Sequence, residues 1–207
     1  GSKLSTPITK IFLSQSFLAV RNPINPAHPV NKIIFIENKC YQSLWNTLKC
    51  SVTKITSFIN RNIKKSRDWA DAFSKYKSFY AKSASDASKD ADYVISCVGK
   101  DDDLNEITTG ESGCFETMKK GAIFIDHTTT SAEIAISLSK IADSAGIHFM
   151  DAPVSGGNLG ARKGQLSIMC GGDAKTFNKS KSILNLYSQG SSLIGRAGSG
   201  QLAKMVN

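Results

Sequence analysis

The chain has 207 residues, of which 41% are hydrophobic and 21% charged, as expected for a soluble globular protein with one main core. No apolar run is long enough to span a bilayer. The five cysteines are widely spaced and form neither a CxxC pair nor a metal-ligand pattern with histidine. We therefore expect reduced thiols in an intracellular protein, without a metal site or a membrane segment.

The net charge of +9 belongs to one end of the chain. Residues 1–83 carry 14 Lys and Arg against 3 acids, whereas the remaining residues are slightly acidic. A basic half could bind nucleic acid, but these charges are scattered and lack a recognisable module or interleaved aromatic residues. We therefore expect no nucleic-acid partner, and keep that function as a third, weaker alternative.

The first sixty residues are the hardest part of the sequence to interpret. Residues 1–30 contain no acid and end in a proline-rich stretch, which indicates an irregular lead, disordered or artefactual. The apolar run NKIIFIEN (31–38) could be the opening strand of a nucleotide-binding fold, but the glycines that should follow it are missing. A second strand is expected to end at Asn60-Arg61 and to lead into a helix.

From about Lys89 onward, strands and helices alternate. The pattern predicts strands over 92–99, 122–126, 147–151, 165–170 and 191–195, a short helix ending at Gly121, and helices over 130–146 and 173–188. Such alternation implies βαβ units and a mostly parallel sheet. The sequence therefore predicts an α/β fold with a Rossmann-like, doubly wound sheet over residues 31–195, degenerate before about residue 58.

Three segments follow strands and should line one edge of that sheet, where ligands bind in such folds. They are CVG (97–99), DHTTT (126–130) and DAPVSGG (151–157). In the last, Ser155 supplies a hydroxyl, while Gly156 and Gly157 permit close backbone approach in an unusual turn. Donors gathered in such a turn can bind a carboxylate, although a plain tight turn between strands explains the same residues.

The segment GSGQLAKMVN (198–207) imitates a dinucleotide fingerprint, because Gly198, Gly200 and Ala203 fit GxGxxA. No βαβ unit surrounds it, so the glycines are better interpreted as the start of a helix. A lone lysine on such a helix is usually a solvated surface residue. Asn207, three residues after Lys204, would share its helix face.

Four segments together resemble the β-hydroxyacid dehydrogenase family, the 3-hydroxyisobutyrate dehydrogenase group: ADYVISCVGKDDDL, FIDHTTTSAEIA, DAPVSGGNLGARKGQLSIMCGG and GSGQLAKMVN. The resemblance covers about residues 59–207. 6-Phosphogluconate dehydrogenase shares the fold, but it has a histidine before the helix asparagine where this chain has Val206. We rank it lower for that reason.

The resemblance assigns roles to single residues. It implies that Lys204 is the catalytic acid/base and that Ser155, Gly156, Gly157 and Asn207 bind the substrate. It implies contacts to NAD or NADP from Cys97, Val98, Gly99 and Thr129, and from Asn60 and Arg61 on the adenosine side. An arginine at the end of the second strand, where NAD enzymes have an acid, accommodates a 2′-phosphate and favours NADP slightly.

The chain departs from the family pattern at both ends. The family's first strand continues into GxGxMG, which is absent here. One hypothesis is a frame error, because KCYQSLWNTLK (39–49), with one choice of codons and a two-base shift, becomes Met-Leu-Ser-Ile-Pro-Met-Glu-His-Ile-Lys, similar to the family's usual continuation. At the other end, residues 196–207 would only begin the helix that leads into an all-α domain.

The sequence thus predicts an NAD(P)-dependent oxidoreductase that interconverts a short β- or γ-hydroxy acid and its semialdehyde. The alternative is a catalytically inactive, truncated relative or interaction module without cofactor binding. The expected partner is the small hydroxy acid or semialdehyde. A homo-oligomer is typical of the full-length family but doubtful for this chain. The expected location is cytoplasmic, or the mitochondrial matrix in a eukaryote.

Overall fold

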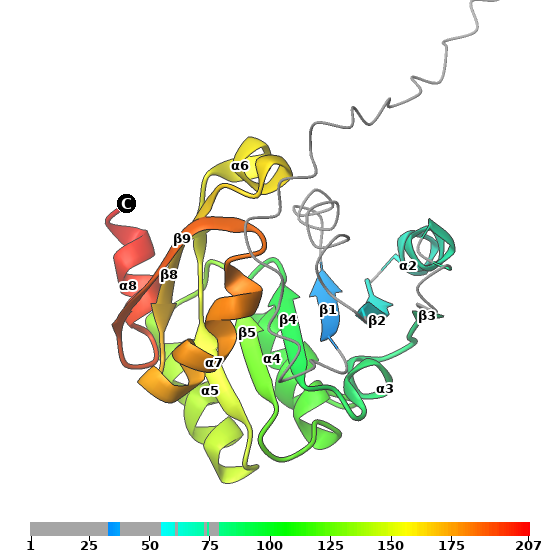
Figure 1. Cartoon of the computed structure of the whole chain (residues 1–207). Helices are drawn as coiled ribbons and strands as arrows, with labels where there is room; N and C mark the ends of the chain where they lie inside the picture. The colour runs from blue at the N-terminus through cyan, green and yellow to red at the C-terminus, as the bar shows by residue number, and fades with distance from the viewer. Residues whose placement is uncertain (1–32, 38–54, 61, 73, 75–78) are drawn as a thin grey trace, which may run out of the picture.

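The computed structural model describes residues 33–37, 55–60, 62–72, 74 and 79–207 (Figure 1). Its centre is one nine-stranded sheet with the order β3-β2-β1-β4-β5-β6-β8-β7, in which β9 also pairs with β8. The strands are β1 (Ile33–Glu37), β2 (Ile55–Ile59), β3 (Phe79–Tyr80), β4 (Tyr93–Cys97), β5 (Ile123–Asp126), β6 (His148–Asp151), β7 (Val154–Ser155), β8 (Leu166–Gly171) and β9 (Ser188–Gly195).

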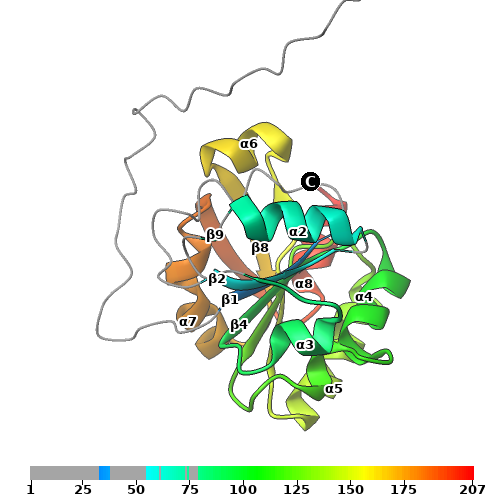
Figure 2. The same ribbon diagram turned by 90° about the vertical axis from the view of Figure 1, so that its right-hand side faces the viewer.

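Helices cover both faces of this sheet, which makes the fold doubly wound as predicted (Figure 2). They are α2 (Ile63–Ala72), α3 (Ala84–Ser88), α4 (Asp101–Thr109), α5 (Ala132–Ser144), α6 (Gly157–Lys163), α7 (Ala174–Leu184) and α8 (Ser199–Met205), with a 3₁₀ turn at Cys114–Glu116. In the view of Figure 2, α7 lies on one side of the sheet, and α3, α4 and α5 lie on the other.

Two hydrophobic cores follow from the alternation of side chains along the central strands. In β4 and β5, Ile95 and Ile125 face the core beneath α7, whereas Val94 and Phe124 face the core beneath α4 and α5. Each strand is apolar on both faces because it is covered on both, as is typical of parallel sheets. Phe124 packs in both modes at once, edge-on to Phe115 and stacked on Phe149.

The helix signals in the second half of the chain mostly hold. Ser131 caps α5 by accepting a hydrogen bond from the Ile134 amide, and Gly146, at φ +75°, lies just beyond the helix end. Asp173 caps α7 in the same way. The prediction of a short helix ending at Gly121 is wrong. The 3₁₀ turn before it ends at Glu116, and Gly121 is a turn residue with a positive φ.

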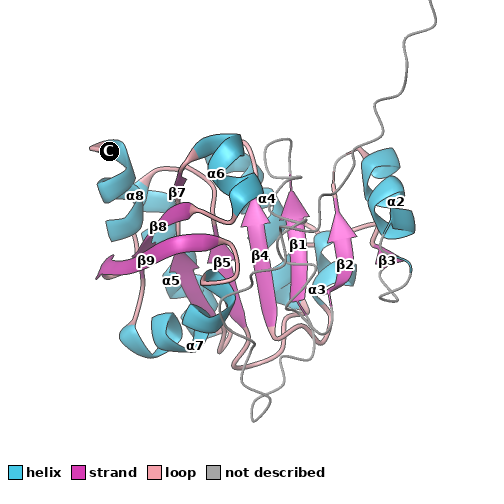
Figure 3. Ribbon diagram, turned by 45° about the horizontal axis from the view of Figure 1, so that its top comes forward, coloured by secondary structure: helices cyan, strands magenta, loops and turns pink. Residues whose placement is uncertain are grey.

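The strand order reverses between β1 and β4. The chain runs outward from β1 to β2 and β3, then crosses to the other side of β1 and continues through β4, β5 and β6, all parallel. Figure 3 shows β1, β2 and β4 pointing the same way, so their carboxyl ends share one edge. A crevice for a nucleotide forms at such a reversal point in doubly wound sheets.

Beyond β6 the sheet becomes mixed. β8 runs antiparallel to β6 and β7 and parallel to β9, so "mostly parallel" is the correct description. The glycine-rich stretch after Ser155 is more than the turn that the sequence indicated, because residues 157–163 form α6. Gly164 ends that helix in the left-handed conformation.

Several predicted features lie outside the described residues: the lead over 1–30, Arg61, and the segment 39–49 to which the frame hypothesis refers. Among the helices of the described part, none is long and apolar enough to cross a membrane.

Helix α8 packs unusually close to β8 and β6, and glycines permit this. A Cβ at Gly200 would lie 2.4 Å from the Met169 carbonyl oxygen and 2.7 Å from Asp151 Oδ2. A Cβ at Gly171 would lie 2.4 Å from Asp151 Oδ1. Both positions therefore exclude any side chain unless the helix moves away from the sheet.

We expect Gly200→Ala to destabilise the fold by about 1–3 kcal/mol, because the added methyl overpacks this contact. Gly190→Ala is the matched control: no atom lies within 4 Å of its Cβ position in β9, and its φ is not positive. That change should alter stability by no more than ~0.5 kcal/mol. Chemical denaturation of both variants measures the difference. Equal effects would contradict the close approach of α8.

Candidate functional site

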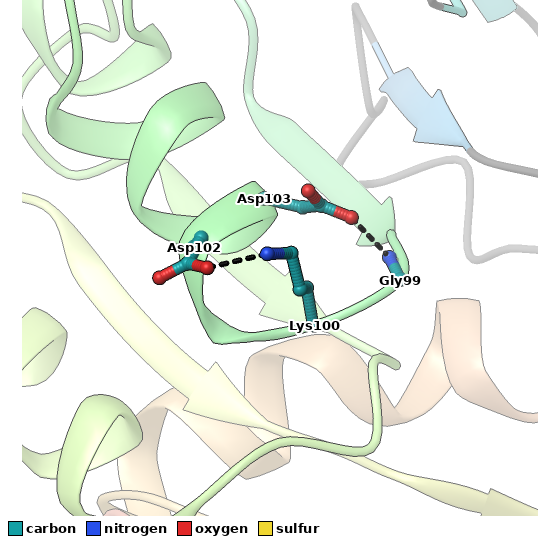
Figure 4. A network of polar contacts seen from close by, with 4 residues as sticks. All are labelled: Gly99, Lys100, Asp102 and Asp103. Carbon is teal, nitrogen blue, oxygen red and sulfur yellow. Dashed lines mark hydrogen bonds and ion pairs between the residues drawn. The ribbon is translucent and has the colours of Figure 1, made fainter.

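The loop after β4 is the first part of the candidate site. The Val98 amide donates to Thr128 Oγ1 at 3.0 Å, and the Gly99 amide donates to Asp103 Oδ2 at 3.2 Å. Figure 4 shows that second contact beside the exposed ion pair of Lys100 and Asp102. The Thr128 and Asp103 side chains thus fix the backbone after β4, while Gly99 itself is exposed at the carboxyl edge of the sheet.

The loop over residues 128–131 is held by three different elements. Thr128 donates from both its amide and its hydroxyl to Asp126 Oδ1, at 3.1 and 2.5 Å. The Gln201 side chain of α8 contacts the loop twice, accepting from the Thr130 amide at 3.1 Å and donating to the Thr128 carbonyl at 2.8 Å. On its far side, the Asp101 carboxylate of α4 accepts from the amide and hydroxyl of Ser131.

Thr129 is the one residue of this loop that is exposed. Thr128 and Thr130 are 2% and 5% exposed, and Ser131 is partly buried and caps α5. The N-cap of α5 is Ser131, so none of the three threonines caps that helix. Thr129 is thus exposed on a loop that hydrogen bonds hold in place.

Asp126 is fully buried beneath that loop. Its Oδ1 accepts from Ser96 Oγ at 2.7 Å as well as from Thr128, whereas its Oδ2 has no hydrogen-bond partner among the described residues. Burial raises the pKa of Asp126 to about 7, against the opposing effect of these hydrogen bonds; the nearby Asp151 charge adds to the increase. Near neutral pH the carboxyl is therefore close to its midpoint.

His127, the next residue, faces the opposite side of the sheet. Its Nδ1 lies 2.6 Å from the Ala152 carbonyl oxygen and its Nε2 lies 2.8 Å from the Tyr187 hydroxyl. Because the carbonyl can only accept, Nδ1 carries the proton and Nε2 accepts from the tyrosine. Burial lowers the pKa of His127 to about 4. This neutral histidine joins the loop after β5 to the start of the Ala152–Gly157 segment.

The turn at Ser155 has the conformation that the glycines predicted. Gly156 and Gly157 have φ values of +121° and +56°, which side chains rarely adopt. Both glycines are exposed, and Ser155 at the end of β7 is partly so. Figure 1 shows α6, which follows directly, standing out from the end of the sheet. The turn can therefore present backbone amides and a hydroxyl to a ligand.

Lys204 lies on α8, partly buried, one helical turn after Gln201. Because residues three apart share a helix face, Lys204 projects from the side of α8 that contacts the 128–131 loop. The expectation that the glycines open a helix is confirmed: Gly198 caps α8 at φ +89°. Asn207 is different, because α8 ends at Met205 and Asn207 lies exposed beyond it rather than on the helix face.

Two asparagines stabilise the turn that follows β2. The Asn62 amide donates to Asn60 Oδ1 at 2.9 Å, and the Lys64 amide donates to Asn62 Oδ1 at 3.1 Å. Asn60 thus turns the chain out of β2, and the following helix α2 begins at Ile63 with Lys64 and Lys65 in its exposed first turn. Basic side chains therefore lie next to the position that the sequence assigned to the adenosine end of the cofactor.

Four residues that organise this edge were not singled out from the sequence: Asp126, His127, Asp151 and Gln201. Each is buried and polar, and the type of residue alone does not show burial. A signal existed for the two aspartates, since each ends a strand whose preceding residues are mainly apolar. Within the described residues, no three His, Cys, Asp or Glu side chains come together as metal ligands.

Known proteins are similar to this chain in sequence and in fold. Residues 51–195 match the family model described as the NAD binding domain of 6-phosphogluconate dehydrogenase. The chain belongs to this family. An uncharacterized oxidoreductase of Shewanella frigidimarina is 42% identical over 148 residues, which are 72% of this chain and 50% of that protein. The mitochondrial 3-hydroxyisobutyrate dehydrogenase of Rattus norvegicus is 35% identical over 127 residues, 61% of this chain and 38% of that protein.

A solved structure agrees. The 3-hydroxyisobutyrate dehydrogenase of Mycobacterium tuberculosis, in a structure with L-serine, superposes with a TM-score of 0.74 at 26% identity, over 85% of this chain and 58% of that one. The resemblance to the hydroxyacid dehydrogenase group is thereby confirmed, and the domain is an NAD(P)-binding domain. The chain spans about half the length of the curated relatives it matches.

The described residues fit a dinucleotide at the β1/β4 reversal point. Gly99 and Thr129 are both exposed, one on the loop after β4 and the other on the loop after β5, and hydrogen bonds hold each loop in place. Glu37, at the end of β1, pairs with Cys97 at the end of β4, so the two strands end together. The residues that follow β1, where a pyrophosphate would bind in this fold, lie outside the described part.

The buried Asp126 predicts a measurable pH dependence. With a folded-state pKa of about 7, the folded chain retains a proton between about pH 4 and 7 that the unfolded chain has lost. The free energy of unfolding therefore falls as the pH rises through this window, by about 1.4 kcal/mol per pH unit, because the folded chain holds a proton that the unfolded chain has released.

We expect Asp126→Asn to remove that contribution, so that its stability-versus-pH slope is more positive than that of the parent chain across this window. Urea denaturation at several pH values measures both slopes. Glu111→Gln, at an exposed loop, is the control and should keep the parent slope. Parallel curves for Asp126→Asn and the parent would show that Asp126 is ionised in the folded chain throughout.

Proposed function

We propose that this chain is the cofactor-binding part of an oxidoreductase that interconverts a short β- or γ-hydroxy acid and its semialdehyde with NAD or NADP. One observation carries the proposal: α8, which bears Lys204, is hydrogen-bonded through Gln201 to both sides of Thr129. A basic side chain is thus held beside the loop expected to contact the nicotinamide. The L-serine in the mycobacterial relative's structure is itself a β-hydroxy acid, which supports this substrate class.

The proposed chemistry divides between the cofactor and the protein. When bound, a reduced nicotinamide would supply the hydride that the carbonyl carbon of the semialdehyde needs. Lys204 donates a proton to the carbonyl oxygen, giving the hydroxy acid, and takes it back in the reverse direction. Its positive charge also stabilises the alkoxide that develops during the transfer.

The substrate carboxylate is assigned to the Ser155–Gly157 turn. Two consecutive left-handed glycines expose their backbone there, and the Ser155 hydroxyl adds a donor. Asn207 is assigned to the substrate as well. Cys97, Val98, Gly99 and Thr129 are assigned to the nicotinamide half of the cofactor, and Asn60 and Arg61 to the adenosine half.

We expect Lys204→Met to lower kcat for oxidation of short hydroxy acids by about 10²-fold or more, because the proton donor and acceptor is lost. NADPH should still stabilise the variant against heat, since the lysine is not assigned to the cofactor. Lys140→Met, at an exposed site on α5, is the control and should keep full activity. A parent chain whose melting temperature does not change with either cofactor would instead favour the inactive relative.

For the cofactor we propose a preference for NADP through Arg61. The parent chain should bind NADPH more tightly than NADH, and Arg61→Ala should remove about tenfold of that preference, the equivalent of one hydrogen bond to a charged group. Arg67→Ala is the control: that guanidinium lies 5.2 Å from the Tyr80 ring centroid and is not assigned to the cofactor. Titration by tryptophan fluorescence measures both affinities, and an unchanged ratio in Arg61→Ala would exclude the assignment.

A further inference from the structure

Gln201 connects helix α8 to two other parts of the sheet edge, the end of β6 and the loop after β5. Its backbone amide donates to Asp151 Oδ2 at 3.0 Å, which ties the start of α8 to the end of β6. Its side-chain amide bridges to the Thr128 carbonyl and the Thr130 amide, which ties the same turn of α8 to the loop after β5. The residue is fully buried.

The two side-chain hydrogen bonds of Gln201 go to the residues on either side of Thr129. The side-chain oxygen accepts from the residue after Thr129, and the side-chain nitrogen donates to the residue before it. The backbone on both sides of Thr129 is therefore fixed, while the Thr129 side chain itself stays exposed. The uncharged amide of a glutamine can accept through its oxygen and donate through its nitrogen at the same time.

Lys204 follows Gln201 by one turn on the same helix face, so the bridge also sets where the lysine lies relative to Thr129. In the proposed reaction a hydride reaches the carbonyl carbon while a proton donor lies near the carbonyl oxygen. The hydride donor and the proton donor must both lie within a few tenths of an ångström of their reactive positions. A single buried side chain spanning both elements is suited to impose that distance.

We propose that Gln201 is a positioning residue that couples the Thr129 loop to the helix carrying Lys204, so that a cofactor seated on the loop also fixes the lysine. This inference rests on the proposed function, because it takes Thr129 as a cofactor contact and Lys204 as the acid/base. Gln201 touches neither the cofactor nor the substrate in this scheme. It acts through the two elements it joins.

The coupling is measured by amide hydrogen exchange of α8 with and without saturating NADPH. In the parent chain, NADPH should slow exchange of the amides over residues 201–205 by about fivefold or more, the lower end of usual coupling between sites. In Gln201→Ala the α8 amides should no longer respond, although NADPH still binds. In the same variant kcat should fall by about 10²-fold with little change in KM for the cofactor.

Gln201→Glu separates positioning from simple loss of stability. As a carboxylate it can accept from the Thr130 amide but cannot donate to the Thr128 carbonyl, whereas the protonated acid can do both. Because burial favours the protonated form, the variant should behave like Gln201→Ala at pH 9 and approach the parent, compared at the same pH, near pH 5. A purely structural role would not restore coupling at low pH.

Ser88→Ala is the control for lost stability. Ser88 is fully buried and hydrogen-bonded to the Ser85 and Cys114 carbonyls, at the end of α3 that leads to the amino end of β4, away from the site. This variant should lose stability but keep the α8 response and kcat.

The outcomes separate the two proposals. If NADPH does not bind the parent chain, the proposed function is wrong and the inference falls with it. If NADPH binds and Lys204→Met loses activity, but Gln201→Ala keeps the α8 response and kcat, only the positioning role is wrong. An α8 response that persists in Gln201→Glu at pH 9 would overturn the positioning role in the same way.

Discussion

The carboxylate of Asp151 beneath the first turn of α8 is the contact on which the functional edge depends. It accepts from the Gly198 amide at 2.7 Å and the Gln201 amide at 3.0 Å, groups that no residue within the helix can satisfy. Burial raises the pKa of Asp151, while these amides oppose the increase. A negative charge at a helix start is also favoured by the helix dipole. This contact fixes the start of α8 on the sheet.

The rest of the edge is assembled around that helix. Gln201 bonds α8 to the loop after β5, and Asp101 of α4 bonds to the same loop at Ser131. Thr128 of that loop accepts from the Val98 amide, just after the end of β4. Buried hydrogen bonds of this kind specify one arrangement, because breaking any of them leaves a polar group without a partner. The glycines at 171 and 200 are the steric counterpart, since they let the helix come close enough for the carboxylate to reach.

The sequence predicted much of the fold and less of the site. Apolar strands such as that over 122–126 and capped helices such as that beginning after Ser131 are local patterns, and they formed where expected. The turn conformation at Gly156 was also foreseeable, because few other residues adopt it. The bridge made by Gln201 was not, because it joins residues more than seventy positions apart and a glutamine in a helix is ordinary. The helix over 157–163 was not predicted, because glycines are unfavourable inside helices and this segment contains two of them.

The 128–131 loop has a consequence for how such a site can change over evolution. Thr128 bonds to Asp126 through its side chain, Ser131 caps α5 through its side chain, and the Thr130 side chain is buried, so substitutions at these three residues disturb the edge. Thr129 alone has a side chain that faces outward. Variation in what the loop contacts is therefore confined to one position, which can be sampled without loss of the fold. A library randomised at residue 129 explores ligand contact, and one randomised at its neighbours explores mainly chains with a disturbed edge.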